Sequence, residues 1–102
     1  MISYKIIQKW DSGVKPTEVY ISVAETQSLF DCLVDKTGDP ENWTELCVSI
    51  NGVHALGWRV HAHSGCWYPV RNFKATLDEH FRHVCMREDR PIMEIHLSVR
   101  RP

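Results

Sequence analysis

Histidine and cysteine are the side chains of this sequence whose number and spacing could support metal chemistry: six histidines and four cysteines occur among 102 residues. His61 and His63 lie two apart in a predicted strand, and His80 and His83 lie three apart in a predicted helix, so each pair shares one face. A tetrahedral zinc site needs four such ligands that converge. The strand pair is expected to face away from the helices, and the C-x2-4-C spacing of structural zinc sites is missing. We therefore predict no metal site and no cofactor.

Cys66 is the cysteine with the most suggestive neighbours, because Ser64-Gly65-Cys66-Trp67 shares a few residues with the nucleophile segment of cysteine proteases. The chain is far too short for the two-lobed fold that supplies the histidine and asparagine of those enzymes. A catalytic thiolate also needs a paired base, and nothing in the sequence selects one histidine. We predict no catalytic residue, and a small metal- or thiol-dependent enzyme using Cys66 and nearby histidines stays as an alternative hypothesis. The remaining cysteines are expected to be reduced and partly buried: Cys32, Cys47 and Cys85.

Composition places the chain among ordinary globular proteins. Apolar residues make up 43% and charged residues 25%, and the formal net charge is -1. That balance argues against non-specific binding to nucleic acid or to membranes. No apolar run approaches the roughly 20 residues that span a bilayer, and residues 1–10 lack the apolar core of a signal peptide. We therefore expect one domain over residues 1–102, located in the cytoplasm. Motifs for nucleotide binding or hydrolysis are also missing.

The N-terminal half is predicted to form a hairpin followed by a helix. Ile2–Trp10 and Thr17–Val23 alternate apolar and polar residues, and the loop of about six residues between them is rich in turn formers. Apolar residues then recur at helical spacing, with Thr26 or Ser28 available to cap the start. Gly38 is expected to end this helix.

Asn51-Gly52 predicts a second hairpin, because this pair lies between two alternating segments, 44–50 and 54–63. A two-residue turn would place the apolar residues of the two strands on opposite faces of the sheet. A three-residue turn with the glycine as a left-handed bulge would pair Leu46 with Leu56 and put both apolar sets on one face. We therefore predict the bulged turn.

A helix over 73–88 and a strand over 92–100 complete the predicted elements. Asn72 could cap that helix, or Thr76 and Glu79 could form a capping box and start it later. The order ββαββαβ predicts an α+β fold, a two-layer sandwich of a mostly antiparallel sheet of about five strands with two helices on one face. The last six elements read as the ferredoxin-like βαββαβ, in which the second strand of the chain would be central and paired on both sides. In that case Ile2–Trp10 would have to join the sheet elsewhere, or the topology is a different helix-on-sheet fold. The final strand, if exposed, could pair with a second copy.

The uncovered face of the predicted sheet is one candidate surface. Its candidate binding residues are Tyr20, Arg59, His61, His63, His96 and Arg100. A solvated face is the simplest interpretation, since antiparallel sheets often leave one side to water. Modules that bind RNA or single-stranded DNA on a sheet stack bases on exposed aromatics, and only Tyr20 clearly points outward here. Nucleic-acid binding is therefore an alternative hypothesis for this face.

Aromatic residues in a loop beside the second helix give the leading hypothesis. Tryptophan, tyrosine and arginine are enriched at the hot spots of protein interfaces. The predicted partner-binding residues are Trp67, Tyr68, Arg71, Lys74, His80, His83 and Arg87. The sequence thus favours a small non-enzymatic protein-binding domain, such as an adaptor or a stoichiometric inhibitor. Within that class, an inhibitor encoded by a phage or mobile element and directed at a host defence complex is one hypothesis, because the chain is small and carries no recognisable family motif.

Overall fold

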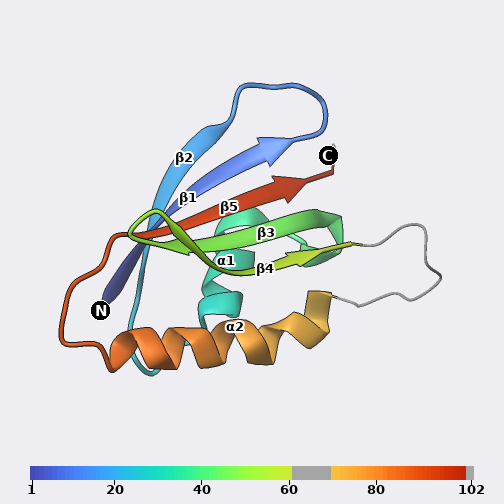
Figure 1. The fold of residues 1–102 in the computed structure, drawn as a ribbon. Helices are drawn as coiled ribbons and strands as arrows, with labels where there is room; N and C mark the ends of the chain where they lie inside the picture. Colours follow the sequence, from blue (N-terminus) through green and yellow to red (C-terminus); the bar gives the residue numbers. More distant parts are fainter. Residues whose placement is uncertain (61–69, 101–102) are drawn as a thin grey trace.

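The computed structural model describes residues 1–60 and 70–100, and the described elements follow the predicted order (Figure 1). A short 3-10 helix, η1, is added between the first helix and the third strand. The elements are β1 (Ile2–Trp10), β2 (Thr17–Val23), α1 (Leu29–Thr37), η1 (Pro40–Asn42), β3 (Trp43–Ile50), β4 (Val53–Arg59), α2 (Val70–Cys85) and β5 (Met93–Val99).

The strand β5 lies in the middle of the sheet and joins the two hairpins. The strand order is β2-β1-β5-β3-β4. β5 pairs in parallel with β1 and antiparallel with β3, whereas β1 with β2 and β3 with β4 form antiparallel hairpins (Figure 1). The predicted α+β fold with five strands and two helices is confirmed, but the sheet is mixed because α2 returns the chain to start β5 in the direction of β1.

Two expectations about strand order need correction. The ferredoxin-like order is not confirmed, since it would place β2 at the centre of the sheet and β2 is an edge strand. The final strand is also not a free edge, because β5 is paired with β1 on one side and with β3 on the other. Its backbone therefore offers no edge to a second copy, and the outer strands are β2 and β4.

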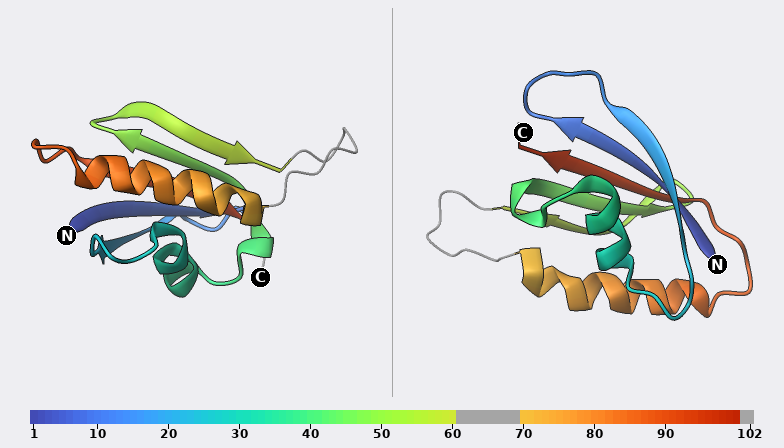
Figure 2. Two further views of the ribbon diagram at one scale, coloured as in Figure 1. Left: turned by 90° about the horizontal axis from the view of Figure 1, so that it is seen from below. Right: turned by 180° about the vertical axis from the view of Figure 1, so that it is seen from behind.

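Both helices cover one face of the sheet, and the apolar core lies between the two layers (Figure 2). Alternate side chains of each strand face this core, and β5 shows the pattern most clearly. Its side chains alternate strictly between buried and half-buried positions. The largest fully buried side chains include Tyr4, Ile6, Leu46, Ile95 and Leu97 from the sheet, and Leu29, Leu33, Leu77 and Phe81 from the helices. The opposite face of the sheet is left uncovered by helices.

The helix α2 begins and ends about three residues earlier than predicted, at Val70 and Cys85. Asn72 and Thr76 therefore lie inside the helix and do not cap it. The amphipathic pattern explains the shift, because Val70 is buried like Phe73 and extends the apolar stripe by one turn towards the N-terminus. Neither helix, within residues 1–60 and 70–100, is long and apolar enough to cross a membrane.

The turn between β3 and β4 also differs from the prediction. Ile50 pairs with Val53, so the turn contains only Asn51 and Gly52, whose φ angles are 53° and 80°. Two positive φ angles are typical of the two-residue turns that match the twist of a hairpin. Leu46 consequently pairs with Trp58 rather than with Leu56. The extra residue that the apolar pattern requires lies inside β4 and not in the turn.

Candidate functional site

A thiol and an imidazole meet on the uncovered face of the sheet. Cys47 of β3 and His54 of β4 lie with Sγ and Nδ1 2.9 Å apart, a distance at which the two atoms share a hydrogen bond. Which of the two donates depends on the tautomer of the ring. Cys47 is half-buried and His54 is exposed, so the pair is open to solvent from one side.

A β-bulge in β4 allows His54 to reach this face. Val48 pairs with Leu56, and the next residue of β3 pairs with His54, so Ala55 is an extra residue without a partner in β3. In a regular strand His54 and Leu56 would share one face, because they lie two residues apart. The bulge breaks that parity, so that Leu56 packs towards the core while His54 lies on the uncovered face.

Gly57 makes the room in which the imidazole ring lies. It is the β4 residue that pairs with Cys47. A Cβ atom at this position would lie 3.2 Å from Cε1 of His54 and 3.3 Å from the carbonyl oxygen of Leu46. Both distances are shorter than ordinary van der Waals contacts between carbon and its neighbours. The absence of a side chain at Gly57 is therefore part of what brings the ring to the thiol.

A second histidine lies opposite Cys47 on the neighbouring strand at the other side of β3. His96 of β5 pairs with Cys47 in the register of β3 and β5. Its Nε2 lies 3.1 Å from a carboxylate oxygen of Glu94, and the side chains of these two residues are 39% and 27% exposed. Within the described ranges, no group of three or more histidine, cysteine, aspartate or glutamate side chains is arranged to hold a metal ion.

The thiol and the first imidazole line a shallow hollow of about 400 Å³ at the β4 side of the sheet. At one end of it, the guanidinium of Arg59 lies 3.4 Å from a carboxylate oxygen of Glu45. The hollow is lined by Glu45, Leu46, Cys47, His54, Gly57, Trp58 and Arg59. Its rim thus presents both signs of charge next to a nucleophilic atom.

Two other cysteines of the described chain lie in less reactive surroundings. Burial raises the pKa of the Cys32 thiol, and the nearby carboxylate of Asp35 raises it further. Burial also raises the pKa of the Cys85 thiol, with a further contribution from Glu25. A raised pKa leaves less of the nucleophilic thiolate near neutral pH. The sequence pointed to Cys66, which lies outside the described residues, and gave no sign of the contact between Cys47 and His54.

The predicted residues of the uncovered face do not form one cluster. Arg59 and His96 are on this face, but β3 separates their strands. Tyr20 is 66% exposed on β2, at the opposite edge of the sheet from β4. Arg100 is exposed just beyond the end of β5. His61 and His63 lie outside the described residues.

The predicted partner-binding residues of α2 also point in different directions. The ammonium group of Lys74 lies 3.1 Å from a carboxylate oxygen of Asp31 on α1. His80 faces the sheet, where its Nε2 lies 3.4 Å from the hydroxyl oxygen of Tyr4. His83 is exposed and turned away from the core. These three side chains therefore do not form one surface.

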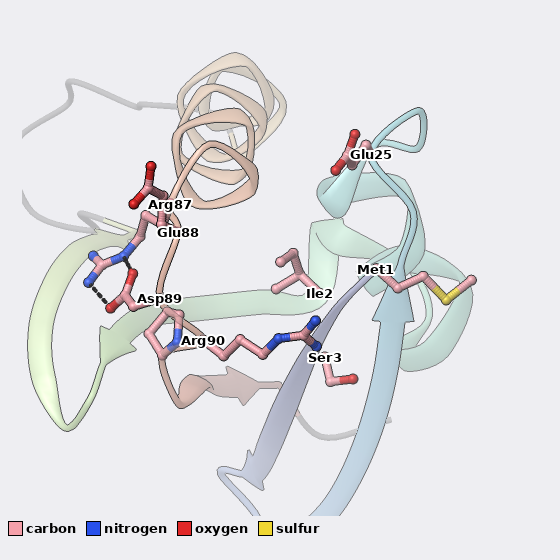
Figure 3. A pocket seen from close by; sticks show the side chains of 9 residues that line it. Met1, Ile2, Ser3, Glu25, Arg87, Glu88, Asp89 and Arg90 are labelled. Atoms are coloured by element: carbon pink, nitrogen blue, oxygen red, sulfur yellow. Dashed lines mark hydrogen bonds and ion pairs between the residues drawn. The ribbon is translucent and has the colours of Figure 1, made fainter.

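Arg87 lies beyond the end of α2, and its guanidinium makes two 2.8 Å hydrogen bonds to the carboxylate of Asp89. It borders a pocket of about 410 Å³ near the N-terminus of the chain (Figure 3). Figure 3 shows Arg90 extending across this pocket towards Ser3, with Glu25 on the far side. The lining mixes acids and bases, so the pocket has no single electrostatic preference. Trp67, Tyr68 and the side chain of Arg71 lie outside what the structure describes.

No family model, no curated protein and no solved structure matches the chain.

Proposed function

We propose that this chain is a small protein-binding domain that pairs the outer edge of β4 with an extended segment of a partner protein. The observation that carries the proposal is the position and composition of β4. It is an outer strand of the sheet, and five of its seven residues are exposed. An exposed strand with unpaired N–H and C=O groups is a template for strand addition.

One hydrogen bond shows which backbone groups of β4 face away from β3. The N–H of Val60 donates to the carbonyl oxygen of Thr44, so the backbone at Val60 faces β3. Successive residues of an antiparallel strand face alternately towards and away from the neighbouring strand. The N–H groups of Gly57 and Arg59 therefore face the outer edge, where a docked strand would accept hydrogen bonds from them.

Among the residues that the structure describes, the edge of β4 lacks the protecting features that the edge of β2 has. β2 follows directly after Pro16 and carries Glu18, whose carboxylate lies 3.5 Å from the ammonium of Lys5. Side chains of α1, including Asp35 and Lys36, line a hollow beside β2. Charged residues, prolines and covering helices are the features that discourage pairing at an edge. Within β4, Arg59 is the only residue with a formal charge at neutral pH.

The hollow next to β4 supplies the specificity of the proposed interaction. Alternate side chains of a docked strand would lie on the uncovered face, next to the side chains of β4. There they would meet the polar groups of Cys47 and His54 and the charged pair of Glu45 and Arg59. A segment with polar side chains at alternate positions suits these neighbours best. An adaptor and a stoichiometric inhibitor could both use the edge in this way.

Nucleic-acid binding is less well supported by the same face. Lys5, Arg59 and His96 each have a carboxylate within 3.5 Å, which reduces the attraction of these groups for phosphate. The exposed aromatic Tyr20 is three strands away from the hollow. Stacking and phosphate contacts would therefore have no common groove among the described residues.

A peptide selection tests the proposal. A displayed library of random linear peptides is panned on the protein, and the dissociation constants of the selected peptides are measured for the wild type, R59P and R59A. Proline removes the outward N–H of residue 59, whereas alanine keeps it and removes only the side chain. We expect selected peptides to lose at least about tenfold in affinity for R59P and less for R59A, as removal of a backbone hydrogen bond predicts.

Three outcomes would overturn the proposal. The first is that no peptide is selected, and the second is that selected peptides bind R59P as tightly as the wild type. The third is that β4 of one molecule pairs with β4 of another in a dimer that R59P dissociates. The last result would make the edge a self-association surface instead of a site for a partner protein.

A further inference from the structure

Cys47 is not an isolated cysteine, because the neighbouring strand β4 brings an imidazole to its thiol. Nδ1 of His54 lies 2.9 Å from Sγ of Cys47. On the other side of β3, His96 of β5 is the register partner of Cys47, and its own side chain pairs with Glu94. A cysteine with an imidazole at hydrogen-bond distance has the arrangement of an activated nucleophile, in which the ring accepts the thiol proton.

We propose that Cys47 is a site of thiol–disulfide exchange, at which it forms a mixed disulfide with a small disulfide compound while His54 accepts the proton. The inference does not depend on binding at the edge of β4, because it concerns the reactivity of the chain alone. The bulge at Ala55 and the missing side chain of Gly57 are the two local features that place the ring against the thiol.

The reaction is an exchange between a thiol and a disulfide. The Sγ atom of Cys47 attacks one sulfur of the small disulfide, and its proton passes to Nδ1 of His54. The new S–S bond forms as the old one breaks, and the leaving thiolate receives the proton from the imidazolium. One protein thiol is thereby oxidised to a mixed disulfide and half of the small disulfide is reduced to a free thiol.

The hollow around Cys47 gives the compound access. It has a volume of about 400 Å³ and is lined by residues of β3 and β4. Both described helices lie against the other face of the sheet (Figure 2). The charged groups among the lining residues of the hollow are Glu45 from β3 and Arg59 from β4, which lie 3.4 Å apart. Burial and nearby carboxylates raise the pKa of the Cys32 and Cys85 thiols. Near neutral pH these two thiols therefore hold less of the nucleophilic thiolate.

The experiment uses oxidised glutathione as the probe. The reduced full chain is incubated with an excess of it near pH 7, samples are quenched with acid, and the modified cysteines are quantified by mass spectrometry of peptides. We expect Cys47 to react at least about tenfold faster than Cys32 and Cys85. His54→Ala should slow the reaction of Cys47 by about tenfold or more, within the range for a positioned base. His83→Ala, an exposed histidine remote from the thiol, is the matched control and should leave the rate unchanged.

Two further readouts separate proton transfer from a merely structural role. As the pH is lowered, the rate at Cys47 should fall more steeply in H54A than in the wild type, because the variant lacks the ring that accepts the thiol proton. Gly57→Ala keeps both reacting residues and moves the ring, so it should slow Cys47 while the reaction of Cys85 is unchanged. The proposal is overturned if Cys47 reacts no faster than Cys32 and Cys85. Equal rates and equal pH profiles for the wild type and a folded H54A would overturn it as well.

Discussion

Asp78, in the middle of α2, completes the N-terminus of α1 together with Ser28. One carboxylate oxygen accepts a 2.8 Å hydrogen bond from the hydroxyl of Ser28, and the other accepts a 3.1 Å hydrogen bond from the N–H of Phe30. Ser28 itself accepts from the N–H of Asp31 as the N-cap of α1. Helix ends leave N–H groups without intrahelical partners, and here a side chain from the other helix satisfies one of them. The relationship fixes how the two helices lie on the sheet.

Asp78→Ala is therefore expected to lower the free energy of unfolding by about 1–2 kcal/mol, because it removes two hydrogen bonds at a helix N-terminus. Urea denaturation followed by circular dichroism measures the change. Glu79→Ala is the matched control, since Glu79 is the exposed neighbour on the same helix and should change stability by less than about 0.5 kcal/mol. Equal effects of the two substitutions would show that the contact with α1 contributes nothing.

Asn51 connects the β3–β4 turn to the start of β5. Its side-chain oxygen accepts a 2.8 Å hydrogen bond from the N–H of Ile92, and its own N–H donates to the carbonyl oxygen of Ile92 at 2.8 Å. Asn51→Gly keeps the freedom to adopt positive φ and loses the side-chain bond, so we expect a cost of about 1 kcal/mol. Asn51→Ala loses both and should cost about 2 kcal/mol. Thermal and urea unfolding of the two variants measure these costs. A more stable N51A than N51G would contradict this account.

The partly buried position of the His80 ring predicts that the stability of the fold depends on pH. Burial lowers its pKa, and the nearby His83 lowers it further. The unfolded state then binds a proton more readily than the folded state, so stability rises with pH through this region. The contribution of His80 to the free energy of unfolding is fully present above the pKa of histidine in the unfolded state, near 6.5. It is lost as the pH falls below that value.

Urea unfolding of the wild type and His80→Gln between about pH 5 and pH 8 checks this sign. The wild type should lose more stability than the variant as the pH falls, and the two slopes should agree above about pH 7.5. The exposed His83→Gln is the control and should keep most of the wild-type slope. A steeper acid loss in H80Q than in the wild type would contradict the direction of the shift.

The apolar pattern of the sequence predicted the strands and helices and the face that each one turns to the core. It did not predict where the β3–β4 hairpin would place the extra residue that the pattern requires. The sequence shows that one extra residue is needed for both apolar sets to face the core. An extra residue at Gly52 and one at Ala55 satisfy this condition equally, and local propensity favours glycine. Asn51 already accepts positive φ, so the turn closes with two residues and the bulge lies in β4. The parallel pairing of β5 with β1 depends on the path of α2, which no local pattern encodes.

The candidate site was harder to predict than the fold. Cys47 lies on the uncovered face, but its contact with His54 depends on the bulge, and its pairing with His96 depends on the position of β5. The histidines that stand out by spacing in the sequence were His61, His63, His80 and His83. Sequence spacing within one element does not show which residues of neighbouring strands lie opposite one another.

The loop residues Trp67 and Tyr68 give a direct comparison with the edge of β4. If the edge is the binding surface, the selected peptides should bind Trp67→Ala and Tyr68→Ala with affinities within about threefold of the wild type, a change below about 1 kcal/mol. R59P should weaken the same peptides at least about tenfold, as a lost backbone hydrogen bond predicts. The reverse order, with loss of binding in the loop variants and normal binding in R59P, would move the interface to the loop.

The most direct test of binding at the β4 edge is amide hydrogen exchange measured by NMR, with and without a saturating selected peptide. In the free protein, the N–H groups of Gly57 and Arg59 face solvent and should exchange quickly, whereas that of Val60, bonded to Thr44, should be protected. Strand addition predicts that the peptide slows exchange at Gly57 and Arg59 and leaves the outer residues of β2 unchanged. Peptide binding without new protection at Gly57 and Arg59 would contradict the proposed function.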